Sequence, residues 1–336
     1  MGVSSVLRDT PFSVLDRSRT REGEDGPRAL RDTVDFAREA EKLGFHRFWV
    51  SEHHGVPGVA GSAPTVLAAA VAAATSRIRV GTGGVMLPNH RPLVVAEQFG
   101  VLESLFPGRI DMGLGRSVGF TGGVRRALGH DKDAADGFGG QVGELLGWFT
   151  GDQTVHPQVH AWPAEGLRPA PFLLATGSGA DLAAELGLPL VIGGIRGEDA
   201  MLRAVDRYRA AFRPSRWAGA PHVVLSGTVA VAPSAADARR LLIPEAWSTA
   251  YSRVHGVFPP LVPAEAVESM PMTAAERDRF DAAMDAGQVH GTAQDVAAAL
   301  ESLLLRSGAD EFLVTTSTYD RSRLLESYRL LAGLLS

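Results

Sequence analysis

The chain has 336 residues, of which 45% are hydrophobic, and a formal net charge of −5 at pH 7. This length fits a single large α/β domain, and the lack of a basic block argues against a nucleic-acid-binding protein, because phosphate binding requires clustered Lys and Arg. The sequence contains no cysteine, which excludes disulfides, thiolate metal sites and a cysteine nucleophile.

The N-terminal residues do not combine a basic start with an apolar run, as a secretory signal would. No segment offers about 18 consecutive apolar residues, so no membrane span is expected. These features predict a soluble, cytoplasmic protein without a membrane partner.

The first third of the chain alternates short apolar runs with stretches of helical periodicity. Pro27 favours the start of a helix that Gly44 ends. The predicted strands are 12–16, 48–50, 78–87 and 110–115, and the predicted helices are 27–43, 64–75 and 92–106. Strands that alternate with helices through short connections indicate a parallel sheet.

The same alternation continues after a Gly-rich stretch at 116–137. Thr292 is the expected N-cap of a strongly amphipathic helix near the C-terminus. The predicted strands are 172–175, 189–192, 223–231 and 312–316, and the predicted helices are 124–128, 138–149, 181–186, 198–212, 235–242, 274–286, 292–307 and 321–335. Eight strands with helices between them predict a (β/α)8 TIM barrel, a single domain over 1–336 with insertions at about 117–170 and 233–290.

Glu52, His53 and His54 follow the second predicted strand, at the end of a barrel where active sites lie. Neighbouring residues of an extended chain point to opposite sides, so one imidazole can face the barrel mouth while the other packs outward. This spacing argues against a two-histidine metal site. Either one histidine is catalytic, or both are loop residues that hydrogen-bond the backbone.

Three further segments contain candidate binding groups. The glycines at 81–84 interrupt a strand and indicate either a bulge beneath a ligand or a bend at a barrel corner. Arg116, with neighbouring arginines that include Arg126, is either an anion ligand or a surface cation. Thr176, Gly177, Ser178 and Gly179 precede a predicted helix, where backbone N–H groups can bind phosphate.

Five segments together resemble the bacterial-luciferase-like flavin-dependent monooxygenases, at 44–54, 79–88, 107–116, 182–189 and 308–316. The resemblance implies a TIM barrel that binds reduced FMN supplied by a separate flavin reductase. It further implies that O2 adds to ring carbon C4a of the flavin, and that the resulting peroxide transfers one oxygen atom to a small organic substrate.

The resemblance also assigns site residues. His53 matches the catalytic histidine of the family, and Gly83 and Gly84 match a non-proline cis peptide beneath the flavin ring. The matches to the residues that hold the flavin side chain and phosphate are Arg116, Arg126, Thr176, Gly177, Ser178 and Gly179. No metal is implied.

The partners that the resemblance implies are the reductase and a second copy of the chain, which would dimerise through the apolar helices 64–75 and 92–106. The Ala-, Gly- and Arg-rich composition favours a role in secondary metabolism. Two other functions stay open. One is an oxidoreductase of the same fold that uses the deazaflavin F420, and the other is a flavin-binding barrel without turnover.

The chain departs from the family pattern in three places. The phosphate loop at 176–179 is about two residues shorter than in many relatives. The segment 192–196 replaces a more polar and aromatic one, and Gly115 stands where the luciferase catalytic subunit has a thiol. We therefore expect no stabilisation of the flavin peroxide by a thiol at this position.

Overall fold

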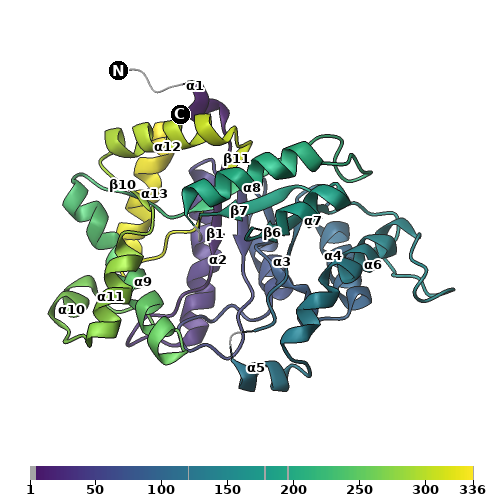
Figure 1. The fold of residues 1–336 in the computed structure, drawn as a ribbon, viewed down its shortest axis with the longest axis horizontal. Coiled ribbons are helices and arrows are strands. Elements are labelled where there is room, and N and C mark those ends of the chain that lie inside the picture. Colours follow the sequence, from purple (N-terminus) through teal and green to yellow (C-terminus); the bar gives the residue numbers. More distant parts are fainter. Residues whose placement is uncertain (1–4, 120, 178, 195–196, 336) are drawn as a thin grey trace.

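The computed structural model describes residues 5–119, 121–177, 179–194 and 197–335. Parallel strands form a closed barrel with helices around it (Figure 1). The barrel strands are β1 (Phe12–Asp16), β2 (Arg47–Val50), β3 (Arg79–Thr82), β4 (Val85–Met86), β5 (Ile110–Gly115), β6 (Ala170–Ala175), β7 (Leu190–Gly193), β8 (Val223–Gly227) and β11 (Glu311–Val314).

The order of the strands is β3-β2-β1-β11-β8-β7-β6-β5-β4, and an additional pairing of β3 with β5 closes the ring. The short strand β4 continues β3 after the glycine interruption, and both pair with β5. The barrel therefore has eight strand positions, and the predicted (β/α)8 TIM barrel is confirmed.

The helices follow the predicted alternation closely. They are α1 (Ser5–Asp9), α2 (Gly26–Lys42), α3 (Pro64–Ala74), α4 (Pro92–Leu105), α5 (Gly122–Ala127), α6 (Phe138–Thr150), α7 (Gly179–Leu186), α8 (Glu198–Ala211), α9 (Ala235–His255), α10 (Ala264–Ser269), α11 (Ala274–Met284), α12 (Ala293–Ser307) and α13 (Arg321–Leu335), with 3-10 turns η1 (Leu87–Asn89) and η2 (Lys132–Gly137). Thr292 is the N-cap of α12, because its hydroxyl accepts from the Asp295 backbone N–H in a capping box.

The expected strand 223–231 is wrong as one barrel strand. The chain leaves the barrel at Thr228, and its second half, β9 (Val229–Val231), pairs with β10 (Val289–Gly291) in a separate two-stranded sheet. The side chain of Thr316 stabilises this departure, because its hydroxyl bonds both the N–H of Val229 at 2.9 Å and its carbonyl at 2.6 Å.

The helix expected at 235–242 is longer than predicted and runs through Pro244 to His255 as α9. A proline inside a helix removes one N–H and leaves one carbonyl, here that of Arg240, without its helical partner. Burial of an apolar face offsets this loss, since Leu242, Ala246 and Trp247 pack into a hydrophobic cluster with α10 and α11. Figure 1 shows these three helices beside the barrel, at the lower left.

The interior of the barrel is layered. At the N-terminal ends of the strands, Asp111 accepts from the guanidinium groups of Arg47 at 2.8 Å and Arg79 at 2.6 Å, and Glu311 accepts from Arg47 at 2.9 Å. An apolar layer lies above these charges and consists of Trp49, Phe172, Val191, Val224 and Leu313. The charged layer therefore closes one end of the barrel, and the opposite end is left for a site.

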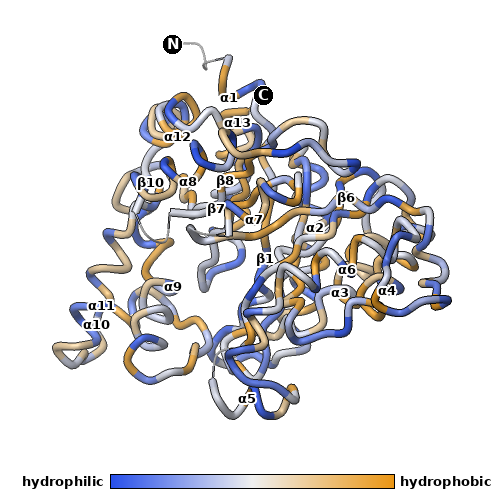
Figure 2. The backbone as a smooth tube through the Cα atoms, turned by 45° about the vertical axis from the view of Figure 1, so that its right-hand side comes forward, coloured by the Kyte–Doolittle hydropathy of each residue, from blue (hydrophilic) through white to orange (hydrophobic). Residues whose placement is uncertain are grey.

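The main hydrophobic core lies between the strands and the surrounding helices. Figure 2 shows hydrophobic colour along α3, α4 and α6 and hydrophilic colour on many of the outer loops. Among the described residues, no helix combines the length and apolar character required to cross a bilayer.

Candidate active site

The C-terminal ends of the barrel strands surround a cleft with a volume of about 920 Å³. This is the end of a parallel barrel at which active sites lie. The residues that line the cleft include Ser51, Glu52, His53, Gly83, Gly84, Met86, Gly115, Arg116, Asp136, Phe138, Leu174, Thr176, Gly179, Leu182, Gly193 and Ser226. They lie at or just after the C-terminal ends of β2 to β8, or belong to η2, α6 and α7.

One side of this cleft consists of glycine backbone. The Gly83–Gly84 peptide bond is cis. A Cβ atom on Gly83 would lie 2.7 Å from a methyl carbon of Leu15, and one on Gly84 would lie 2.7 Å from the Gly113 carbonyl oxygen. No side chain fits at either position, so bare backbone faces the cleft beside His53.

His53 follows β2, is half-buried and lines the cleft, whereas His54 turns away to Glu52. The backbone N–H of His53 donates to the Gly61 carbonyl at 2.8 Å, and its Nδ1 lies 3.2 Å from the Ser51 hydroxyl. Burial lowers the pKa of His53, and the positive charges of Arg17 and Arg19 lower it further, to about 4. The imidazole is therefore neutral at pH 7.

Glu52 is a fully buried carboxylate that joins β2 to the segment after β4. One oxygen accepts from Nε2 of His54 at 2.7 Å, from Nε2 of His90 at 2.9 Å and from the Asn89 amide at 3.1 Å, and the other accepts from the Met86 backbone N–H at 2.8 Å. Burial alone would raise the pKa of Glu52, but the hydrogen bonds from the two histidines lower it to about 2. The charged carboxylate thus holds the glycine segment against β2.

The ligand atoms of Glu52, His54 and His90 lie within 4.8 Å of one another, close enough to bind a metal ion. Their separations of 2.7 and 2.9 Å are those of hydrogen bonds. Both carboxylate oxygens already accept from neighbouring donors, so an ion would have to replace these contacts. The geometry is that of a hydrogen-bonded cluster.

Arg116 lies at the rim of the cleft, with its side chain 56% exposed. Its guanidinium donates to the Ala135 carbonyl at 3.0 Å and to Asp136 at 3.2 Å. Arg126, on α5, is exposed and is not among the residues that line the cleft. The structure thus brings Arg116, but not Arg126, to the same cleft as His53.

The predicted phosphate loop borders the same cleft, before α7. Thr176 and Gly179 line the cleft, and Gly177, with a φ of 81°, accepts from the Ala180 backbone N–H at 3.1 Å. Ser178 lies outside the described residues. Helix α7 begins at Gly179, so backbone N–H groups of its first turn lie beside the cleft.

Sequence reasoning missed several residues of the cleft. Ser226 is the penultimate residue of β8, two residues after the inward-facing Val224, so the period of two along a strand could have placed it at the mouth. Asp136 and Phe138 come from a segment without strand periodicity, where no local pattern marks the residues that turn inward.

The family model described as luciferase-like monooxygenase matches residues 10–326. The chain belongs to this family. The family predicted from the five sequence segments is therefore confirmed.

This member of the family is similar to bacterial relatives. A luciferase-like monooxygenase of Escherichia coli K12 is 36% identical over 323 residues, which cover 95% of each chain. An N-acetyl-S-alkylcysteine monooxygenase of Bacillus subtilis is 38% identical over 214 residues, which cover 60% of this chain and 63% of that protein. The solved structure of apo-MsnO8 superposes with a TM-score of 0.86 at 32% identity and covers 98% of both chains.

More distant solved structures show the fold alone. They include the oxygenating constituent of 3,6-diketocamphane monooxygenase in complex with FMN, at 18% identity, and an F420-dependent secondary alcohol dehydrogenase, at 16% identity. Since one fold accommodates both cofactors, the fold of this luciferase-like monooxygenase does not select between them.

Proposed function

We propose that the chain is the oxygenase of a two-component system, which takes reduced FMN from a separate flavin reductase and uses O2 to oxygenate a small organic substrate. The observation that carries the proposal is a single cleft lined by His53, by the cis peptide of Gly83 and Gly84, by Arg116 and by the loop before α7. Its volume of about 920 Å³ leaves room for a tricyclic ring and a substrate together, since small-molecule pockets measure roughly 300–1,000 Å³.

The residues present fit a flavin. The bare backbone of Gly83 and Gly84 offers a flat surface to a planar ring, because no Cβ atom projects there. Reduced flavin, when bound, supplies the electrons that activate O2. The glycines that interrupt the strand therefore form the surface for the flavin ring in this proposal.

The border of the cleft beside α7 fits a phosphate. The first turn of α7 presents backbone N–H groups, and Thr176 adds a hydroxyl. Arg116 would exchange its exposed partner Asp136 for the phosphate, at little cost because exposed ion pairs contribute about 0–1 kcal/mol. Gly177, Gly179 and the undescribed Ser178 complete this proposed loop, and Arg126 would join it from α5 only by a movement of its side chain.

His53 is the proposed catalytic residue. Its Nδ1 is hydrogen-bonded to the Ser51 hydroxyl, and in the tautomer in which Nδ1–H donates to that hydroxyl, Nε2 is free to accept a proton from the substrate or the cofactor. Because the pKa of His53 is lowered to about 4, the ring is neutral at pH 7 and can act as a base or a hydrogen-bond partner.

Two partners belong to this proposal. The reductase supplies reduced FMN, and a second copy of the chain packs on α3 and α4. The exposed apolar side chains Val66, Val94, Val101 and Leu105 lie on these two helices and support an interface between copies.

The test is product formation from N-acetyl-S-benzylcysteine, chosen because a relative is named for this substrate class, with chemically reduced FMN and O2. We expect oxygen-dependent product with FMN. With His53→Gln we expect about 100-fold less product at unchanged FMN affinity, and His160→Gln, at an exposed histidine, serves as the matched control. Oxygen uptake is measured in parallel over a set of sulfides and ketones, so that the test of oxygenase activity does not depend on that one compound.

The deazaflavin alternative is tested in the same experiment with reduced F420 in place of FMN. Binding of F420 with hydride transfer and no oxygen dependence would replace the monooxygenase proposal. Binding of neither cofactor would contradict both assignments.

A further inference from the structure

Arg17 directly follows the C-terminal end of β1, close enough to His53 for its charge to lower the pKa of that histidine, although it is not itself among the residues that line the cleft. Alternate residues of a strand share one face, and on β1 that face points into the barrel: the Ser13 hydroxyl bonds Glu311, and Leu15 lies beneath Gly83. Arg17 is the next residue of this series, one layer above Leu15. Its guanidinium donates at 2.8 Å to the carbonyl of Thr315. The backbone N–H of Thr315 in turn donates to the carbonyl of Gly227, which follows the cleft residue Ser226 on β8.

The guanidinium of Arg17 is only partly used. All of its contacts with described residues come from Nη2, which reaches Thr315, Ser317 at 3.4 Å and the Glu245 carboxylate of α9 at 2.5 Å. Among the described residues, the buried Nε atom of Arg17 has no hydrogen-bond partner, and neither has one buried oxygen of Glu245. A guanidinium normally binds a carboxylate through two parallel N–H groups, and here that second bond is not made.

A second cation lies nearby and is already held. Arg19 is 5% exposed, and its Nη2 donates to the Ser248 hydroxyl at 2.5 Å and to the Pro259 carbonyl at 3.4 Å. Burial lowers the pKa of Arg19 to about 10, so it remains charged at pH 7. Arg19 therefore adds positive charge next to His53 and is not a free ligand.

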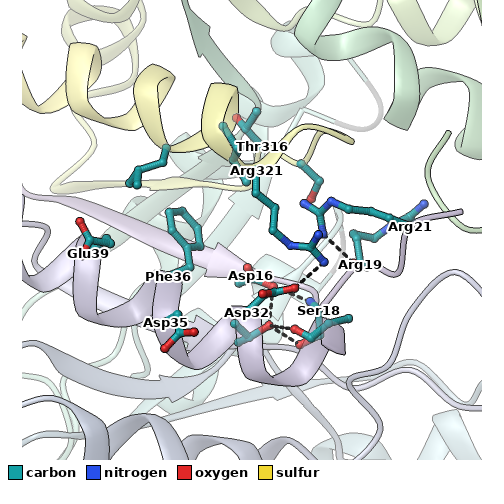
Figure 3. Close-up of a pocket in the computed structure, with 15 residues that line it drawn as sticks. Asp16, Ser18, Arg19, Arg21, Asp32, Asp35, Phe36, Glu39, Thr316 and Arg321 are labelled. Carbon is teal, nitrogen blue, oxygen red and sulfur yellow. Dashed lines mark hydrogen bonds and ion pairs between the residues drawn. The ribbon is translucent and has the colours of Figure 1, made fainter. Parts of the chain in front are cut away.

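The carboxylates near these cations do not balance them. Asp16 is bound to the Ser18 backbone N–H at 2.5 Å and to the Thr33 hydroxyl at 3.3 Å. It lines a separate cavity of about 170 Å³ between α2 and α13, where it lies with Arg19 and Arg21 (Figure 3). Glu245 is thus the one described carboxylate that contacts Arg17, and two arginines face it. Because the partly exposed Arg17 and the buried Arg19 share this one carboxylate, this side of the mouth favours a further anion.

We propose that Arg17 binds the carboxylate of an anionic organic substrate at the mouth of the barrel, with α9 closing over it through Glu245. This inference rests on the proposed function, because it names the substrate class of the same site. The carboxylate would bind the Nε side of the guanidinium, and the remainder of the substrate would extend into the cleft toward Gly83 and His53. Arg17 is a binding residue in this arrangement, and the proton chemistry stays with His53.

The test is equilibrium binding to the flavin-free protein, which does not depend on turnover. The probes are N-acetyl-S-benzylcysteine, N-acetylmethionine and benzoate, each compared with its uncharged carboxamide by isothermal titration. We expect at least one carboxylate to bind about tenfold or more tighter than its amide, since a hydrogen bond to a charged group has this effect. The preference should disappear in Arg17→Met and be partly retained in Arg17→Lys.

Arg207→Met is the matched control, because Arg207 lies exposed on α8 in a surface ion pair. It should keep the preference of the wild type. Equal binding of every carboxylate and its amide, no binding of any carboxylate, or a preference that survives in Arg17→Met would each overturn the proposal. An FMN titration separates the two proposals, because failure of the wild type to bind FMN would contradict the oxygenase function and leave the carboxylate site standing, whereas loss of FMN binding in Arg17→Met alone would overturn the assignment of Arg17 to the substrate.

Discussion

The neutral state of His53 has a measurable effect on stability. The pKa of this group is about 4 in the folded protein and 6.5 in the unfolded chain, so the unfolded chain binds more protons between these values. The free energy of unfolding therefore falls as the pH falls through this window. For a single group with these two pKa values, the loss between pH 7 and pH 5 is about 2 kcal/mol.

The assay is urea denaturation at pH 7 and pH 5 of the wild type, His53→Gln and His160→Gln. We expect the wild type and the His160 variant to lose about 2 kcal/mol more than His53→Gln over this range. Glu52 adds little to this difference between pH 7 and pH 5. Its pKa is lowered from 4.5 to about 2 in the folded protein, so its effect on the free energy of unfolding falls mainly below pH 4.5. His46, whose pKa is also lowered by burial, is present in all three proteins and cancels. An equal loss of unfolding free energy in the wild type and in His53→Gln would refute a neutral imidazole at position 53.

Three other predictions concern the barrel and its assembly. Asp111→Asn removes a fully buried charge that two arginines share, and should lower the free energy of unfolding by about 3–5 kcal/mol; a loss below 1 kcal/mol in urea denaturation would contradict a paired buried charge. Gly113→Ala would place a Cβ atom 1.9 Å from the Thr82 carbonyl oxygen, whereas Gly140→Ala has no atom within 4 Å and lies in a helix. We expect the first to abolish soluble expression or lower the melting temperature strongly and the second to raise it slightly, and equal melting temperatures would be inconsistent with this packing. Leu105→Glu, on an exposed apolar side chain, should convert a dimer to a monomer in analytical ultracentrifugation, and a wild-type monomer would remove the proposed interface.

The sequence was sufficient to predict the barrel because its elements depend on local patterns. The apolar run at β1, the proline and glycine that bound α2, and the capping residue Thr292 each mark an element without reference to the rest of the chain. The cis peptide between Gly83 and Gly84 was implied by family resemblance, and spacing alone left a bulge beneath a ligand and a bend at a barrel corner equally open.

Features that depend on distant residues were not predictable in this way. Nothing local to Thr228 shows that the chain leaves the barrel there, because the separate sheet requires β10, about 60 residues later. The continuation of α9 through Pro244 depends on packing against α11. The contact between Arg17 and Glu245 was not predictable for the same reason, since the two residues are 228 positions apart and only the folded chain brings them together.

The most direct test of the central claim is a crystal structure of the protein with FMN. The account predicts the flavin ring against the backbone of Gly83 and Gly84, within hydrogen-bond reach of His53, with the phosphate at the first turn of α7. A flavin bound elsewhere, or a ring that leaves this peptide uncovered, would contradict the account.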